Sequence, residues 1–202
     1  ALYSNTTGSN NVAVGKASLY LNTTSGDNTA IGDTALYTNT ARANTAVGYA
    51  ALYSNTSGQE NVGLGPYSLH KNTTASNNTS VGYASLEDNT TGHSNVAIGH
   101  RCLGDNTTAY ENTSTGYSTL RSNTTGVRCV ANGYRALYSN TTGSNNVAIG
   151  RDALFTNTIG IDCTAIGDSS LYYCTNSHNT AVGYASLLNN SSGYSNAAVG
   201  KH

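Results

Sequence analysis

The sequence predicts an all-β protein, a parallel β-solenoid (a left-handed β-roll) of twelve coils with about seventeen residues each. Three observations support this fold class. Leucine and glycine recur at one fixed spacing, β-branched residues alternate with small ones before each glycine, and Gly, Asn and Thr are too frequent for a helix. We treat 1–202 as a single repeat domain and expect it to be a segment of a longer fibre.

The repeat is clearest in residues 1–15, which return almost unchanged at 136–150. Successive copies are seventeen residues apart, except for two steps of sixteen. Both shortened copies lose a residue in the same place, between Asn39 and Asn44 and between Cys174 and Asn179. Since insertions and deletions concentrate in turns, we predict a turn at the motif Asn-Thr-Thr-Gly-x-Asn.

Each copy contains two segments that fit extended structure. One surrounds Leu-Tyr, and the other is Asn-Val-Ala-Ile-Gly, where β-branched residues alternate with small ones. Two strands and two turns would complete one coil. Twelve coils stacked at the usual strand spacing of ~4.8 Å would form a rod of about 56 Å.

Three columns of the repeat define the expected interior. The residue two positions before each glycine is always Ala, Gly or Ser, which indicates close packing on that face. The glycine itself suggests a turn that a Cβ atom would obstruct. The leucine column is complete and is the predicted core: Leu2, Leu19, Leu36, Leu52, Leu69, Leu86, Leu103, Leu120, Leu137, Leu154, Leu171 and Leu187.

Two asparagine columns lie at the two ends of the turn. The first begins with Asn5 and the second with Asn11, and each recurs in nearly every copy. Stacked asparagines form hydrogen-bonded amide ladders, and asparagine also tolerates left-handed turn conformations. We therefore expect a ladder along each column.

Cysteines replace three of these asparagines. Cys163 stands in the second column and Cys174 in the first column one copy later, so they are neighbours if the two columns face each other inside the coil. They could then form a disulfide. Cys102 and Cys129 are a second candidate pair, and four free buried thiols are the alternative. No Cys-x-x-Cys or Cys/His spacing indicates a metal site.

The first asparagine column also contains N-glycosylation sequons. The competing interpretation is that Asn-Thr-Thr serves only the turn and the ladder. The candidate glycosylation sites are Asn5, Asn22, Asn55, Asn72, Asn89, Asn106, Asn123, Asn140 and Asn190. Asn77, Asn78, Asn112 and Asn189 also satisfy the motif.

Composition limits the classes of function. Only 9% of residues are charged and the net charge is -1, so no basic surface exists to neutralise nucleic-acid phosphates. No apolar run approaches the length of a membrane span. The histidines lie in scattered columns without recurring carboxylates, so we expect neither an enzyme nor a cofactor. Tyrosines form columns after the leucine and after the glycine, and we expect them to stack along the rod.

The element Asn-(Val/Thr)-Ala-(Ile/Val)-Gly, seen at 95–99 and 146–150, resembles the head repeat of trimeric autotransporter adhesins. The longer unit Ala-Leu-Tyr-Ser-Asn-Thr-Thr-Gly is similar to repeats of tail-fibre-like proteins that carry an endosialidase-type self-cleaving chaperone. The resemblance covers the whole chain. It implies a left-handed β-roll that trimerises along its axis and forms a rigid adhesive head or shaft, extracellular or on a cell or virion surface. The seventeen-residue period is longer than that of the adhesin head.

Self-association also has an argument from the residues. If leucine, the asparagines and the small residues fill the coil, the Val/Thr and Ile/Val columns point outward as a continuous apolar stripe, which marks an interface. The alternative places Ile/Val inside a monomeric rod. We expect a homotrimer or filament, with surface glycans or host or matrix proteins as further partners. The alternative function is an ice-binding or carbohydrate-binding module.

Overall fold

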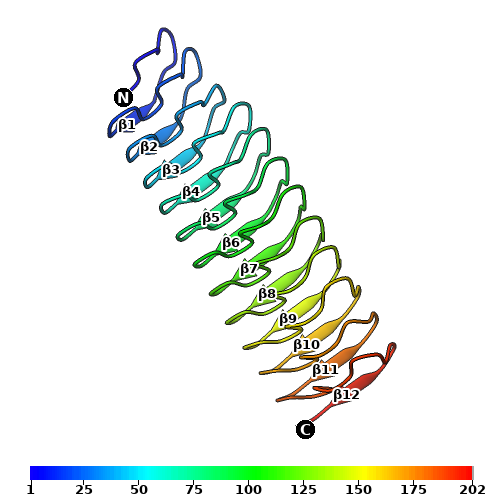
Figure 1. Ribbon diagram of the computed structural model, residues 1–202. Helices are drawn as coiled ribbons and strands as arrows, with labels where there is room; N and C mark the ends of the chain where they lie inside the picture. The colour runs from blue at the N-terminus through cyan, green and yellow to red at the C-terminus, as the bar shows by residue number, and fades with distance from the viewer. Residues whose placement is uncertain (202) are drawn as a thin grey trace.

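The computed structural model describes residues 1–201 and is a β-solenoid without helices in that range, as the sequence predicts. Twelve three-residue strands form one parallel sheet in chain order (Figure 1). Each strand pairs with the same repeat position of the next coil, for example Ala13 with Ala30. The strands are β1 (Val12–Val14), β2 (Thr29–Ile31), β3 (Thr45–Val47), β4 (Val62–Leu64), β5 (Thr79–Val81), β6 (Val96–Ile98), β7 (Thr113–Thr115), β8 (Val130–Asn132), β9 (Val147–Ile149), β10 (Thr164–Ile166), β11 (Thr180–Val182) and β12 (Ala197–Val199).

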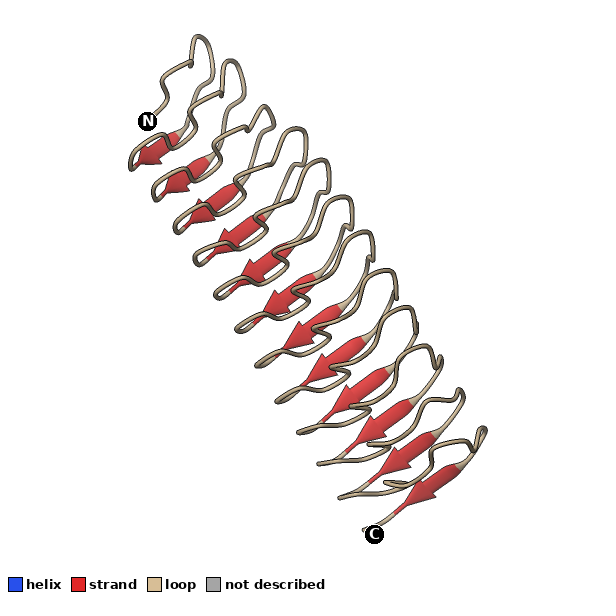
Figure 2. Ribbon diagram, viewed as in Figure 1, coloured by secondary structure: helices blue, strands red, loops and turns tan. Residues whose placement is uncertain are grey.

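The prediction of a second strand around Leu-Tyr is wrong. Figure 2 shows one strand on one side of each coil, with loops and turns elsewhere. The leucines adopt the left-handed conformation, with φ of 51° at Leu2 and 49° at Leu120, which interrupts an extended chain. This side still bonds coil to coil, because Leu2 N donates to Ser18 O at 2.9 Å.

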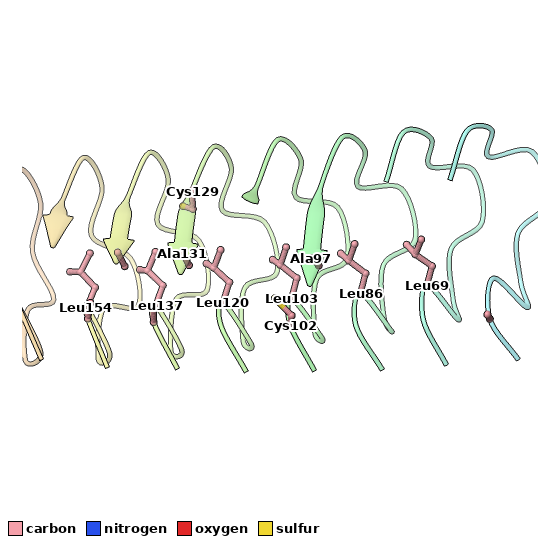
Figure 3. Packing of buried hydrophobic residues seen from close by; sticks show 14 of the residues in the cluster. Leu69, Leu86, Ala97, Cys102, Leu103, Leu120, Cys129, Ala131, Leu137 and Leu154 are labelled. Atoms are coloured by element: carbon pink, nitrogen blue, oxygen red, sulfur yellow. The ribbon is translucent and has the colours of Figure 1, made fainter. Parts of the chain in front are cut away.

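The leucine column forms the centre of the rod, as predicted. Ten of the twelve leucines have no exposed surface, while Leu2 and Leu187, in the first and last coils, are partly buried. Figure 3 shows the leucines in file, one per coil, beside residues such as Ala97 and Ala131 of the adjacent strands. The small residue at the middle of each strand leaves room for this file: a Cβ atom on Gly63 would lie 3.4 Å from Leu52 Cδ1.

The glycine that follows each strand has a different reason to be small. Its φ lies in a region that L side chains rarely adopt, at 135° in Gly133. A Cβ atom there would lie 2.6 Å from the carbonyl oxygen of Gly150 in the next coil. Close stacking therefore excludes a side chain at every glycine of this column that has a following coil, from Gly15 to Gly183.

Two glycine-to-alanine substitutions should separate these two causes. We expect Gly133→Ala to lower the free energy of unfolding by about 1–3 kcal/mol, since it forces a strained backbone as well as a contact with Gly150. Gly63 lies at a strand centre where most coils already have alanine. Gly63→Ala should therefore raise the free energy of unfolding by about 0.4–1 kcal/mol, because alanine reduces the conformational entropy of the unfolded chain. Denaturant titration measures both, and equal effects would contradict this account.

Candidate interaction surfaces and the asparagine ladders

The outer face of the sheet has one mainly aliphatic column, the Ile/Val column, beside a column in which half of the residues are threonine. In the interior strands the central small residue is buried, and the residues on either side of it point outward. The exposed fraction is 41% for Ile98 and 40% for Ile149. The sequence left the direction of the Ile/Val column open, and the structure places it outside the coil because leucine and the asparagines already fill the interior.

The outer columns form a narrow strip along the whole rod. Twelve strands about 4.8 Å apart and three residues wide make a face of about 500 Å², of which the aliphatic column is only one part. The strip is not uniform. Thr115 and Asn132 replace the aliphatic residue in β7 and β8, which makes its middle polar.

Aromatic rings form two ladders after the leucine column. Tyr3, Tyr20, Tyr37 and Tyr53 stack with centroids 4.9–5.2 Å apart and nearly parallel planes, and His70 extends the stack. The second ladder is Tyr138, Phe155 and Tyr172. The stacking expected after the leucine is confirmed. Because each ring covers its neighbour's face, these columns do not offer the exposed ring faces on which a sugar could stack. After the glycine, the rings from Tyr83 to Tyr134 also stack, whereas Tyr67 contacts its neighbours edge to face.

Charged residues fill the interval between the two ladders. Lys71 pairs with Asp88 at 3.0 Å, and Arg121 pairs with Asp105 while its side chain covers Gly104. Lys71 and Asp88 are solvent-accessible, so their pair contributes little to stability, whereas the side chain of Arg121 is mostly buried. Between the two aromatic ladders, charged side chains therefore lie in place of the aromatic rings that stack in the coils on either side.

The first asparagine column forms the predicted ladder. In a typical coil, Asn89 Nδ2 donates to Asn72 Oδ1 at 2.8 Å, and Asn89 Oδ1 accepts from Asn106 Nδ2 at 2.7 Å. Asn89 Nδ2 also donates to the carbonyl of Gly92, three residues later, which closes the turn at 2.9 Å.

The second column also forms the predicted ladder, in which Asn95 Nδ2 donates to Asn78 Oδ1 at 3.2 Å, and it bonds to the backbone as well. Asn78 Oδ1 accepts from the backbone N–H of Asn95 in the next coil at 3.0 Å. Asn78 Nδ2 donates to Gly92 O at 2.9 Å, the same oxygen that Asn89 uses. From coil 2 onward, one carbonyl in each coil therefore accepts from both columns. The bonding of both columns to the same carbonyl was not predicted from the sequence. The constant three-residue spacing between the first asparagine and the turn glycine was the pattern that could have indicated it.

The ladder determines the environment of the sequons. Nδ2, the atom that would carry a glycan, is buried and donates to the ladder, so a glycan and the folded ladder exclude each other there. The fully buried candidates are Asn22, Asn55, Asn72, Asn89, Asn106, Asn123 and Asn140, whereas Asn5 and Asn190 are half-buried. Of the other sequons, Asn78 and Asn112 are buried, while Asn77 and Asn189 are exposed.

The predicted disulfides are not formed, and all four cysteines are buried free thiols. Cys102, in the column before the leucine, forms hydrogen bonds with Ser114 and Thr119. Cys129 lies in the second asparagine column and donates instead to Gly143 O. Burial raises the pKa of Cys129 to about 11. Cys102 and Cys129 each form hydrogen bonds with residues beside their own column, and they do not contact each other.

Cys163 and Cys174 are neighbours, as the facing columns predicted. Their sulfur atoms lie 3.1 and 3.3 Å from the same oxygen, Asn176 O. A hydrogen bond between the two thiols raises the pKa of Cys163 and lowers that of Cys174, because one thiol donates to the thiolate of the other. The cysteines thus occupy the places of two ladder amides.

The fold defines the chain as a β-solenoid repeat protein. No family model, no curated protein and no solved structure matches it. Residues 1–201 contain no group of three or more His, Cys, Asp or Glu side chains placed to hold a metal ion. The same range has no helix of the length and apolarity that a membrane crossing requires.

The ladder can be tested with a matched pair of substitutions. We expect Asn89→Ala to lower the free energy of unfolding by about 3 kcal/mol, since a buried polar group left without its partner costs about 1–3 kcal/mol. Asn189→Ala, at an exposed position, should change it by less than about 0.5 kcal/mol. Denaturant titration of both variants is the measurement, and a small effect of Asn89→Ala would contradict the proposed role of the ladder.

Proposed function

We propose that the chain is a structural and adhesive segment of an extracellular fibre, in which copies of the rod associate side by side through the outer face of the sheet. The observation that carries this proposal is the outward Ile/Val column, exemplified by Ile98, Ile149 and Ile166. A single rod leaves this column in water along its whole length. Burying apolar area is worth about 25 cal/mol per Å², so association through this face is favourable.

The dimensions of the strip support a trimer over a dimer. A stable interface buries about 800 Å² on each partner, which exceeds the roughly 500 Å² of the strip. A homotrimer fits this requirement better than a dimer, because each chain then contacts two partners and the columns flanking the strip contribute area. Trimerisation agrees with the resemblance to adhesin heads and fibre shafts.

Ice binding is the second candidate for the same face. Threonine occupies the first outward position in half of the strands, for example at Thr45, Thr79 and Thr113, on a regular sheet. The threonines of the turn do not support it equally, because hydroxyls such as that of Thr73 donate to the backbone of the next coil. A thermal-hysteresis assay separates the candidates: we expect no hysteresis from a rod whose face is covered by its partners.

Two isoleucines of the same coil allow a controlled test of association. Ile166 lies in β10 on the outer face, and Ile159 lies in the turn with 64% of its surface exposed. We expect Ile166→Lys to reduce the particle to the 20.8 kDa single chain, because charged groups are depleted at interface cores. Ile159→Lys should leave the assembly intact. Light scattering coupled to size exclusion measures the mass.

A monomeric wild-type chain, or dissociation by Ile159→Lys to the same degree as by Ile166→Lys, would contradict the proposal. Circular dichroism of each variant should match that of the wild type, because both side chains point away from the core.

A further inference from the structure

Cys163 of coil 10 and Cys174 of coil 11 are adjacent thiols, whereas every other pair of facing ladder positions has at least one asparagine. In coils 2 to 12, the turn carbonyl accepts from the second column of the preceding coil and from the first column of its own coil. Gly92 O, for example, accepts from Asn78 and Asn89 at 2.9 Å each. At Asn176 O, both donors are cysteines, Cys163 and Cys174.

The chain also contains the matching single replacement. Cys129 occupies the second column one period before Asn146, and its sulfur lies 3.4 Å from Gly143 O. Its partner at that oxygen is Asn140, whose amide donates at 2.9 Å. One cysteine is therefore tolerated as a simple buried substitute for asparagine, while the Cys163–Cys174 pair brings two sulfur atoms into one dry interior position.

We propose that Cys163 and Cys174 form a two-coordinate binding site for a soft monovalent cation, with Cu(I) as the expected ion. Thiolate ligands select soft ions such as Cu(I). Zinc requires four ligands in a structural site, and no group of three His, Cys, Asp or Glu side chains within residues 1–201 could complete one. With both sulfurs buried, no bulk water supplies the missing ligands.

The surroundings suit the charge of the complex. Binding replaces two S–H protons: Cu(I) and two thiols give a bis(thiolato)copper(I) group of charge −1 and two protons, which pass to the solvent buffer, and copper is neither oxidised nor reduced. Asn179 Nδ2 donates to Cys174 Sγ at 3.4 Å. A polar donor of this kind stabilises the buried negative charge. Asn176 O accepts from both thiols in the metal-free chain and loses these two hydrogen bonds when the protons leave.

The experiment refolds the full chain from denaturant without oxygen, in the presence of one equivalent of Cu(I), because the site has no exposed surface in the folded rod. Copper retained after desalting is measured by atomic absorption, and X-ray absorption reports the number of sulfur ligands. We expect one copper per wild-type chain with two sulfur ligands. The refolded complex should also unfold at a higher denaturant concentration than the metal-free chain.

Asparagine substitutions provide controls that keep the fold, since asparagine is the usual residue at these positions. The double variant Cys163→Asn/Cys174→Asn should retain no copper, and Cys129→Asn should retain one equivalent as the wild type does. Loss of a residue that only supports a metal ligand weakens metal binding roughly 10–100-fold. Each single variant, Cys163→Asn or Cys174→Asn, loses a ligand itself, so we expect its affinity for Cu(I) to fall by more than this.

Equal copper retention by the wild type and the double variant would overturn the proposal. So would loss of the copper in Cys129→Asn, or copper bound by a single sulfur in the X-ray absorption spectrum. A wild-type chain that emerges with a disulfide and no copper under these anaerobic conditions would also overturn it. None of these outcomes bears on association through the outer face of the sheet.

Discussion

The structure depends on one backbone oxygen in each turn that receives two amide donors. In coils 2 to 12 the carbonyl belongs to glycine in six coils and to a residue with a side chain in the other five, so the position is needed for its backbone and not for its side chain. Those five residues are Ser25, Ala41, Ala75, Ala109 and Asn176. The two asparagines connect the coil to its own turn and to the preceding coil at the same point. A net contribution of about 1 kcal/mol for each hydrogen bond, repeated along the rod, makes a core of one leucine per coil sufficient.

Much of this architecture could be predicted from the sequence, because a strict period reports directly on geometry. The leucine file, the small residue opposite it, the glycine after each strand and the amide ladders each follow from a single column. The second strand could not be predicted correctly, since leucine in the left-handed conformation is rare and the Leu-Tyr segment has ordinary strand composition. The direction of the Ile/Val column also stayed open, because an alternating strand has two equivalent faces until the other occupants of the interior are known.

The surface was less accessible to sequence reasoning than the interior. The sequons and the paired cysteines were both correctly placed in the asparagine columns, yet their chemistry depends on what the amides contact. Asn89 matches the sequon motif, but in the structure its amide group is bonded within the asparagine ladder. In the shortened coil 3, the amide of Asn39 turns to Ala41 O at 2.6 Å, and Asn22 Oδ1 is left buried without a hydrogen-bond partner. Each coil contacts only its neighbours, so such a defect stays local.

The polar interruption at Thr115 and Asn132 has a consequence for how two rods could align. Identical coils allow a rod to slide along its neighbour by one coil with almost no change in the contacts between aliphatic side chains. An interruption in two adjacent strands removes this freedom, because a slipped neighbour would cover Asn132 with an isoleucine such as Ile149, and burying an unpaired amide costs about 1–3 kcal/mol. Only the alignment without slip places amide beside amide. In the proposed assembly, β7 and β8 would therefore fix the alignment of otherwise periodic surfaces.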